Sequence, residues 1–303
     1  MPILGLILVA LLFGVLVGVV SWRYPRAAPA TPTGVAREVG KAIGRRGRLA
    51  ALRAARFDPS TATGLALTVA LVVAIGGGLI LGVLAFHVRS NSHLIGLDNS
   101  VAKWGHRHAS HTSMSFLNDV TQLGSLYVIV GLCVVLAVAE TIRERTVWVT
   151  AFIVAAVGGE ELITSVVKQV VDRLRPTFNP AAARLGPSFP SGHSATAAVF
   201  YATAVLLIGR WRGRPARAVL AGLAGGLAVA VAASRVLLDV HWLSDVIGGL
   251  ALGWAWFAVC AIAFGGRILR FGAAADIAAA AAAGATARPA APQPVPHRAG
   301  TSG

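Results

Sequence analysis

Apolar residues in this chain collect into seven long stretches, and most polar residues fall between them. A helix that crosses a bilayer needs about 20 predominantly apolar residues, and each stretch reaches or approaches that length. The pattern therefore predicts an all-α integral membrane helical bundle. The expected spans are Ile3–Ser21, Gly64–Phe86, Leu123–Ala139, Val147–Val167, Ser194–Ile208, Ala218–Val236 and Leu243–Phe264.

The composition agrees with this fold class. Of the 303 residues, 56% are hydrophobic and 13% are charged, whereas about 25% of residues are charged in soluble domains. The 27 Lys and Arg exceed the 12 Asp and Glu, which in a soluble protein would favour nucleic acid as a partner. In a membrane protein the excess holds cytoplasmic loops against anionic headgroups, so we expect membrane lipids and no nucleic acid. Cys133 and Cys260 lie in apolar runs, and we expect no disulfide and no metal cluster.

The basic residues also set the expected orientation. Arg23–Arg56 holds nine of them and Gly209–Arg217 holds four, and further arginines follow the third and seventh spans. Cytoplasmic loops carry the excess of Lys and Arg, and alternation places all of these segments on the same side. The connections on the outer side are then His87–Gln122, Lys168–His193 and Arg235–Trp242. We expect a multi-pass protein of the plasma membrane.

Four parts are expected along the chain. Residues 1–22 form a retained N-terminal transmembrane anchor, since they lack the basic start and small-residue cleavage site of a signal peptide. Residues 23–61 form a basic cytoplasmic linker, as either an amphipathic interfacial helix or a solvated segment. Residues 62–266 form a six-span core. Residues 267–303 are Ala-rich and then Pro-rich and are expected to be a disordered tail.

The first outer connection has two features. Asp98, Lys103 and Trp104 fit an amphipathic helix that lies along the outer surface, with the indole at headgroup depth. His106, His108 and His111 follow, but their spacing is loose and no carboxylate completes a zinc site. We therefore expect no metal there.

The second outer connection begins with two cations, Lys168 and Arg175, and Pro176 follows them. On a helix, residues seven apart share a face, so both cations are expected to point at one anion. Pro176 is expected to end that helix. Taken alone, the pair is better explained as interfacial cations that extend toward lipid headgroups.

The same connection ends with Phe189–Ser194, directly before the fifth span. The start of a helix exposes backbone N–H groups and a positive dipole end, which favour a phosphate. Gly192 permits close approach of the backbone, and the Ser191 hydroxyl adds a donor. His193 is placed to exchange a proton with the bound group. A plain N-cap by Ser191 is an alternative compatible with this interpretation.

The third outer connection holds Ser234, Arg235 and His241, and Asp245 follows at the start of the last span. His241 and Asp245 are four residues apart at a helix start, which places them one turn apart on one face. The carboxylate can accept an imidazole N–H, fix the tautomer and leave the other nitrogen free to attack. An interfacial polar contact is the alternative, and the nearby Arg235 favours the functional interpretation.

Together these three connections supply three cations, a helix N-terminus, two histidines and an orienting carboxylate on one side of the membrane. That set suits an oxyanion that is attacked by one imidazole while the other protonates the leaving group.

These residues resemble the three-part signature of the type 2 phosphatidic acid phosphatase superfamily, which also includes the vanadium haloperoxidases. The signature is Lys168…Arg175-Pro176, Pro190-Ser191-Gly192-His193 and Ser234-Arg235…His241…Asp245, and the resemblance covers about Gly64–Phe264. It implies a metal-independent reaction, without a cofactor, through a phosphohistidine. His241 would be the nucleophile, Asp245 its orienting partner and His193 the general acid. The phosphoryl oxygens would be held by Lys168, Arg175, Ser191, Gly192 and Arg235.

The implied substrate is a lipid phosphate, such as phosphatidic acid, phosphatidylglycerol phosphate or a polyprenyl (pyro)phosphate, at the extracytoplasmic face. One alternative is a lipid phosphotransferase of the same fold. Another is a non-catalytic lipid-binding or transport protein, against which the complete His/His/Asp set argues. A haloperoxidase is disfavoured because those relatives are soluble.

Three acidic residues depart from a simple pattern. Asp239 lies where such proteins often carry Gly, and its carboxylate would either repel the phosphate or bind a polar headgroup or Arg173. Glu160 and Glu161 lie inside the fourth span, where charge is costly. Because Glu161 is seven residues before Lys168, we expect a structural ion pair between them.

Overall fold

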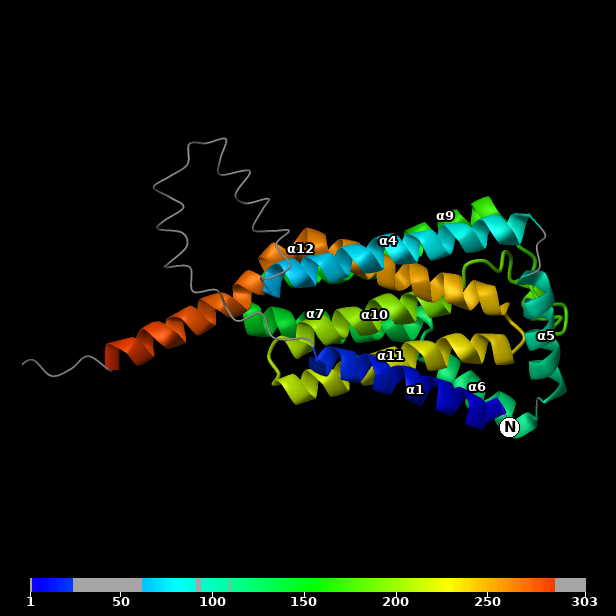
Figure 1. Ribbon diagram of the computed structural model, residues 1–303, viewed down its shortest axis with the longest axis horizontal. Helices are drawn as coiled ribbons and strands as arrows, with labels where there is room; N and C mark the ends of the chain where they lie inside the picture. Colours follow the sequence, from blue (N-terminus) through cyan, green and yellow to red (C-terminus); the bar gives the residue numbers. More distant parts are fainter. Residues whose placement is uncertain (1, 24–61, 91–93, 109, 287–303) are drawn as a thin grey trace, which may run out of the picture.

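The computed structural model describes residues 2–23, 62–90, 94–108 and 110–286, and within them it forms an all-helical bundle (Figure 1). Seven of its helices are long and apolar enough to cross a membrane, and each matches one predicted stretch. The prediction of a multi-span helical membrane protein is confirmed. The helices that contain these spans are α1 (Pro2–Arg23), α4 (Ala62–Arg89), α7 (Leu126–Glu144), α8 with α9 (Val147–Ile153 and Gly159–Val171), α10 (Gly192–Gly209), α11 (Arg214–Leu237) and α12 (Leu243–Thr286).

The fourth span is interrupted in its middle. A π-helical turn, Val154–Gly158, separates α8 from α9. The indole of Trp256 on α12 donates a hydrogen bond to the Ala155 carbonyl within this turn, at 3.0 Å. Such π-turns often lie in helices that carry functional residues, and this one precedes the half-helix that carries Lys168.

Helix α9 ends earlier than the sequence suggested. Asp172 adopts the left-handed conformation with φ 45°, and its N–H closes the last turn on the Lys168 carbonyl at 2.9 Å. Asp is among the residues that tolerate this conformation. The expectation that Lys168 and Arg175 share one helix ended by Pro176 was therefore wrong, because Arg175 lies in the following loop.

Two shorter helices, α5 (Leu94–Arg107) and α6 (His111–Gln122), lie at one end of the bundle (Figure 1), which we call the site end. Helix α5 is amphipathic, as predicted. Asp98 and Ala102 are buried against the bundle, whereas Lys103 and Trp104 are exposed. A 3₁₀ turn, Ala182–Arg184, lies in the loop between α9 and α10.

The opposite end carries the arginine-rich turns after α7 and between α10 and α11. Buried Glu140 on α7 pairs with Arg210, which follows α10, and with Arg143 at 3.7 Å. Both guanidinium groups also lie over the Trp211 ring, at 5.3 and 5.2 Å. These contacts join the two turns, which therefore lie at the same end of the bundle, as the alternation of spans predicts.

Helix α10 occupies the interior of the bundle and contacts α7, α9, α11 and α12. Its residues Val199 and Leu207 are fully buried in an apolar cluster with Phe152 of α8. The start of α10 is therefore held by neighbours on several sides, which matters because that start carries Ser191–His193.

The N-terminal helix α1 packs closely along α11 through glycines. A Cβ on Gly14 would stand 2.7 Å from the Gly222 carbonyl oxygen, and a Cβ on Gly222 would stand equally close to the Gly14 oxygen. Small residues permit such close approach, which drives association where lipid offers no hydrophobic gain. Phe13 also stacks on Trp254 of α12, with ring centroids 5.5 Å apart. The additional span is thus part of the packed bundle.

Helix α12 continues to Thr286. Residues 267–286, which the sequence predicts to be the first part of a disordered tail, are therefore helical in the structure. Alanine is the strongest helix former, and this stretch is rich in it. The remaining tail, 287–303, and nearly all of the expected basic linker, 24–61, lie outside the described residues. The division of the chain into four parts stays a prediction.

We predict that Gly14→Ala lowers the free energy of unfolding by about 1–3 kcal/mol, because the added methyl group overpacks the α1–α11 contact. Thermal unfolding of the purified protein in detergent measures this. Gly5→Ala is the matched control, since nothing lies within 4 Å of a Cβ there. Equal stability of the two variants would contradict the proposed packing.

Candidate active site

The three signature segments, residues 168–175, 189–194 and 234–245, meet at the site end. The Ser191 N–H donates to the Asp245 carbonyl at 3.0 Å, which joins the second segment to the third. Arg175 Nη1 donates to the Val240 carbonyl at 2.9 Å, which joins the first to the third. Residues more than 60 positions apart in the sequence thus form one site.

Glycines on α12 permit this convergence. A Cβ on Gly249 would lie 2.5 Å from the Ser191 carbonyl oxygen, and a Cβ on Gly248 would lie 2.8 Å from the Phe189 ring. Any larger residue at these positions would push the start of α10 away from the start of α12.

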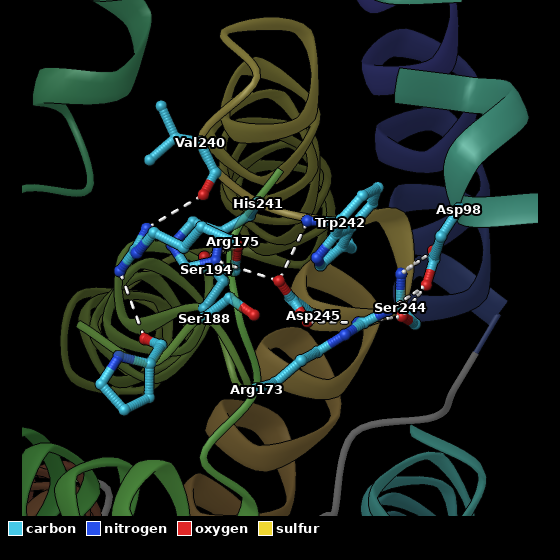
Figure 2. A network of polar contacts seen from close by, with 12 residues as sticks. Asp98, Arg173, Arg175, Ser188, Ser194, Val240, His241, Trp242, Ser244 and Asp245 are labelled. Carbon is cyan, nitrogen blue, oxygen red and sulfur yellow. Dashed lines mark hydrogen bonds and ion pairs between the residues drawn. The ribbon is translucent and has the colours of Figure 1, made fainter. Parts of the chain in front are cut away.

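His241 and Asp245 form a buried pair (Figure 2). The Nδ1 atom of His241 lies 3.3 Å from Asp245 Oδ2, and the same oxygen accepts the Trp242 N–H at 2.9 Å. His241 is 2% exposed and Asp245 is 0% exposed. With a proton on Nδ1 donated to the carboxylate, the lone pair of the imidazole resides on Nε2.

Arg175 lies beside that nitrogen. Its Nη1 is 3.2 Å from His241 Nε2, and its Nε donates to the Gly186 carbonyl at 2.9 Å. Burial lowers the pKa of Arg175, and the Asp245 charge opposes the shift. The guanidinium thus both fixes the loop after α9 and presents an N–H to the Nε2 lone pair.

Burial also governs the charge of His241. It lowers the pKa of the imidazole from 6.5 to about 4, against the hydrogen bond and charge of Asp245, and the charges of Arg175 and Arg235 add to the lowering. The ring is therefore neutral near pH 7, as a nitrogen nucleophile must be.

The start of α10 faces Lys168. Ser191 occupies the N-cap position but makes no capping hydrogen bond, and its Oγ accepts from the Ser194 hydroxyl at 3.0 Å. The interpretation of Ser191 as a plain N-cap is therefore wrong. A Cβ on Gly192 would lie 3.8 Å from Lys168 Nζ, so the ammonium stands near the first turn of the helix. Helix N–H groups and an ammonium together favour an anion.

Arg235 and His193 complete the cluster. Arg235 is 9% exposed, and its Nη1 donates to Thr121 Oγ1 at 3.1 Å. Its buried Nε has no hydrogen-bond partner among the described residues. His193 in the first turn of α10 is half-buried, and the charges of Lys168, Arg175, Arg235 and His241 all act on it.

The acidic residues of α9 differ from the expectation. The charge of Glu161 acts on Lys168, but among the described residues the two side chains form no ion pair within 4 Å. The neighbouring Glu160 is instead fully buried and accepts hydrogen bonds from Thr164 at 2.6 Å and Thr196 at 3.0 Å. Glu160 thus joins α9 to α10 close to the first turn of α10.

Asp239 contacts a histidine of α5 and not Arg173, one of the partners considered for it. Its φ is 54°, which explains why glycine suits this position, and its carboxylate contacts His106 Nδ1 at 3.1 Å. Burial raises the pKa of Asp239, while the His106 hydrogen bond and charge oppose this. Within the described residues, no three His, Cys, Asp or Glu are grouped as metal ligands, and this includes the histidines near His106.

Sequence reasoning missed Arg173 and Asp98 (Figure 2). Arg173 contacts Asp245 Oδ1 at 2.6 Å and Asp98 Oδ2 at 2.7 Å. Both residues line a cavity of about 500 Å³ between α4, α5 and the end of α9, which Trp242 also lines. The position of Arg173 within the first signature segment was a signal, but nothing in the sequence linked it to Asp98.

The arrangement is suited to group transfer at an oxyanion. Lys168, Arg175, Arg235 and the start of α10 lie in one cluster with a neutral imidazole, and the Nε2 of that imidazole lies beside Arg175. A second imidazole, His193, lies within the same electrostatic cluster. Such preorganised positive groups stabilise the charge that develops in a transition state.

Comparison with known proteins supports this view. The model of the PAP2 superfamily matches residues 146–268. Phosphatidylglycerophosphatase B from Bacillus subtilis is 31% identical over 140 residues, which are 45% of this chain and 68% of that protein. A crystal structure of a transmembrane PAP2-type phosphatidylglycerolphosphate phosphatase from Bacillus subtilis has a TM-score of 0.55 and 26% identity. The match covers 65% of this chain and 98% of that one.

Two further relatives match over a smaller share of their length. Lipid A 1-phosphatase from Rhizobium etli is 33% identical over 37% of this chain and 48% of its own. Decaprenylphosphoryl-5-phosphoribose phosphatase from Mycobacterium tuberculosis is 35% identical over 41% of this chain and 66% of its own. The chain thus spans about half the length of the lipid A 1-phosphatase and about two thirds of the length of the decaprenylphosphoryl-5-phosphoribose phosphatase.

We predict that Gly192→Ala weakens binding of inorganic phosphate about tenfold, or by ~1.4 kcal/mol, without loss of stability. Its added Cβ would lie 3.8 Å from both Lys168 Nζ and Thr164 Cγ2, which is ordinary van der Waals contact and forces no shift of the protein. Isothermal titration calorimetry and thermal unfolding measure the two properties. Gly209→Ala at the other end of α10 is the control, and equal phosphate affinity of both variants would refute the anion site.

Proposed function

The chain belongs to the PAP2 superfamily, and on that premise we propose that it is a membrane phosphatase that hydrolyses a lipid phosphate or a polyprenyl (pyro)phosphate. One observation carries the proposal. His241 is held on Asp245 through Nδ1, while its Nε2 faces Arg175 in a cluster of cations. This is the arrangement required of a nitrogen nucleophile that attacks a phosphoryl group.

In the first half-reaction the Nε2 lone pair of His241 attacks phosphorus. The N–P bond forms as the bond from phosphorus to the leaving oxygen breaks. His193, which is protonated once the phosphoryl anion is bound beside it, gives this proton to that oxygen, and the lipid alcohol or phosphate departs. Asp245 stabilises the positive charge that develops on the His241 ring.

In the second half-reaction water replaces the lipid. Neutral His193 takes a proton from the water as its oxygen attacks phosphorus, and the N–P bond breaks. Inorganic phosphate leaves, and both histidines return to their starting states. Lys168, Arg175, Arg235, the Ser191 hydroxyl and the backbone N–H groups of Gly192 and His193 hold the non-bridging oxygens in both steps.

Metal independence is part of the proposal. Three side-chain cations in a poorly hydrated pocket supply the positive charge that a metal supplies elsewhere. The same cations repel a divalent ion, since like charges at short range are costly where water is scarce.

The proposed side of the membrane follows from charge. The arginine-rich turns, with Arg143 and Arg210, lie at the end of the bundle opposite the site. Because such turns remain cytoplasmic, we propose that the site faces the extracytoplasmic side of the plasma membrane. The proposed substrate is then a lipid phosphate in the outer leaflet, of the kinds after which the relatives are named, a phosphatidylglycerophosphate or a decaprenyl lipid.

We predict that His241→Asn lowers phosphate release at least about 1,000-fold, since the nucleophile is lost. A panel of purified lipid phosphates in mixed micelles, with and without EDTA, measures this release. Labelled lipid product is scored alongside free phosphate to detect phosphotransfer. His108→Asn, an exposed histidine of the same end, is the control. Near wild-type turnover in His241→Asn would refute the nucleophile, and loss of activity with EDTA would refute metal independence.

We also predict that the acid limb of the kcat/KM profile lies near pH 4 rather than 6.5. His241 attacks only when neutral, and a lowered pKa keeps it neutral to a lower pH. Initial rates from pH 3.5 to 8 test this, after correction for the ionisation of the substrate measured by ³¹P NMR. A limb at or above pH 6.5 would contradict the burial of the nucleophile.

A further inference from the structure

We propose that Arg173 and Asp98 are positioning residues for the nucleophile, and that through them the surface helix α5 is a working part of the active site. The inference rests on the proposed function, since it concerns the carboxylate that orients His241. We call Asp98, Arg173 and Asp245 the carboxylate clamp.

The carboxylate of Asp245 needs both of its oxygens satisfied, because it is 0% exposed. Its Oδ2 receives His241 Nδ1 and the Trp242 N–H, whereas its Oδ1 receives Arg173 Nη1 at 2.6 Å. A buried carboxylate oxygen without a partner is costly, so without Arg173 the carboxylate would rotate or take up a proton. Either change would alter the hydrogen bond that fixes the His241 tautomer.

Arg173 is itself fixed at several points. Its Nη2 lies 2.7 Å from Asp98 Oδ2, and its Nη1 also donates to the Ser244 hydroxyl at 2.7 Å. Its guanidinium lies over the Trp242 ring, 5.3 Å from the centroid. A planar guanidinium held in this way reaches two carboxylates at once, which a lysine ammonium at the same position cannot do in the same geometry.

Asp98 brings a separate element to the site. It lies on α5, outside the segment 146–268 that matches the family model, and it is 2% exposed. Its Oδ1 accepts the Ser244 N–H at 2.9 Å, and its Oδ2 accepts the Ser244 hydroxyl at 2.5 Å. Asp98 thus holds both the guanidinium and the first turn of α12, the turn that carries Asp245 (Figure 2).

The clamp also sets the charge near the nucleophile. Two carboxylates share one guanidinium, which leaves a net charge of about −1 beside the imidazole. The other groups whose charges act on His241 are Arg175 from the loop after α9 and Arg235 from α11. His193 of α10 is coupled to His241 and to Lys168 of α9. Loss of the Asp98 charge alone would therefore make the surroundings of His241 more positive and ease its deprotonation.

Two variants separate charge from position. Asp98→Asn removes a charge and keeps the size of the side chain, whereas Arg173→Lys keeps the charge and removes the planar fork. We expect each to lower kcat about tenfold or more, with a smaller change in KM, as for other residues that orient a reactive group. Asp98→Asn should also move the acid limb of kcat/KM to lower pH, and Arg173→Lys should leave it in place.

The experiment uses the full chain in detergent micelles, with Asp119→Asn on α6 as the matched control for an exposed carboxylate. Rates are measured from pH 3.5 to 8, and the titration of His241 is followed in parallel by ¹⁵N NMR of histidine-labelled protein. The NMR arm does not require turnover, so it tests the clamp even if the wild type hydrolyses no lipid phosphate. That last result would count against the proposed function alone.

Three outcomes would overturn the clamp. The first is wild-type kcat in both variants, and the second is an unchanged His241 titration in Asp98→Asn. The third is a loss of activity that is proportional to the loss of thermal stability in both variants, with no shift of the pH profile. In that case Asp98 and Arg173 would only hold α5 on the bundle and would not position the nucleophile. A downward His241 shift in Asp98→Asn, with Asp119→Asn unchanged, supports it.

Discussion

Several cationic side chains lie close to a neutral imidazole in this protein. The rest of the site depends on the groups that offset the repulsion between these cations. Lys168, Arg175 and Arg235 act on one another across a pocket from which protein atoms exclude much of the water. Backbone carbonyls hold Arg175 in place, and Asp245 offsets part of the charge. A phosphoryl group with its negative oxygens is the ligand that such a pocket stabilises most.

The packing of the helices holds these side chains in place. Glycines of α12 permit the start of α10 to approach the start of α12, and the loop after α9 is fastened to the connection between α11 and α12. In a membrane, apolar burial cannot drive helices together, so close packing and interhelical hydrogen bonds carry more of that task. The contact of Glu160 with Thr196 and the packing of α1 on α11 are two examples.

Much of the fold and of the candidate site could be predicted from the sequence, because these features depend on residues that are close together along the chain. Seven spans follow from runs of apolar residues, and the pairing of His241 with Asp245 follows from their spacing at a helix start. The convergence of three segments followed from the alternation of spans. Each of these inferences uses residues that lie close in the sequence or a rule that counts membrane crossings.

Other features depend on contacts that the sequence does not reveal. The left-handed Asp172 ends α9 early and moves Arg175 into a loop, although nearby residues are good helix formers. Arg173 finds Asp98 at a separation of 75 residues, and no periodic pattern joins them. Glu160 rather than Glu161 enters the core, and the π-turn just before it shifts the register of the residues that follow.

The proposed function depends on one pocket in which His241 attacks a bound phosphoryl group. An experimental structure of the protein with orthovanadate, which mimics the pentacovalent phosphorus, tests this most directly. The account predicts vanadium bonded to His241 Nε2, with its oxygens on Lys168, Arg175, Arg235 and the N–H groups at the start of α10. Vanadate bound away from His241, for instance in the cavity beside Arg173 and Trp242, would contradict it.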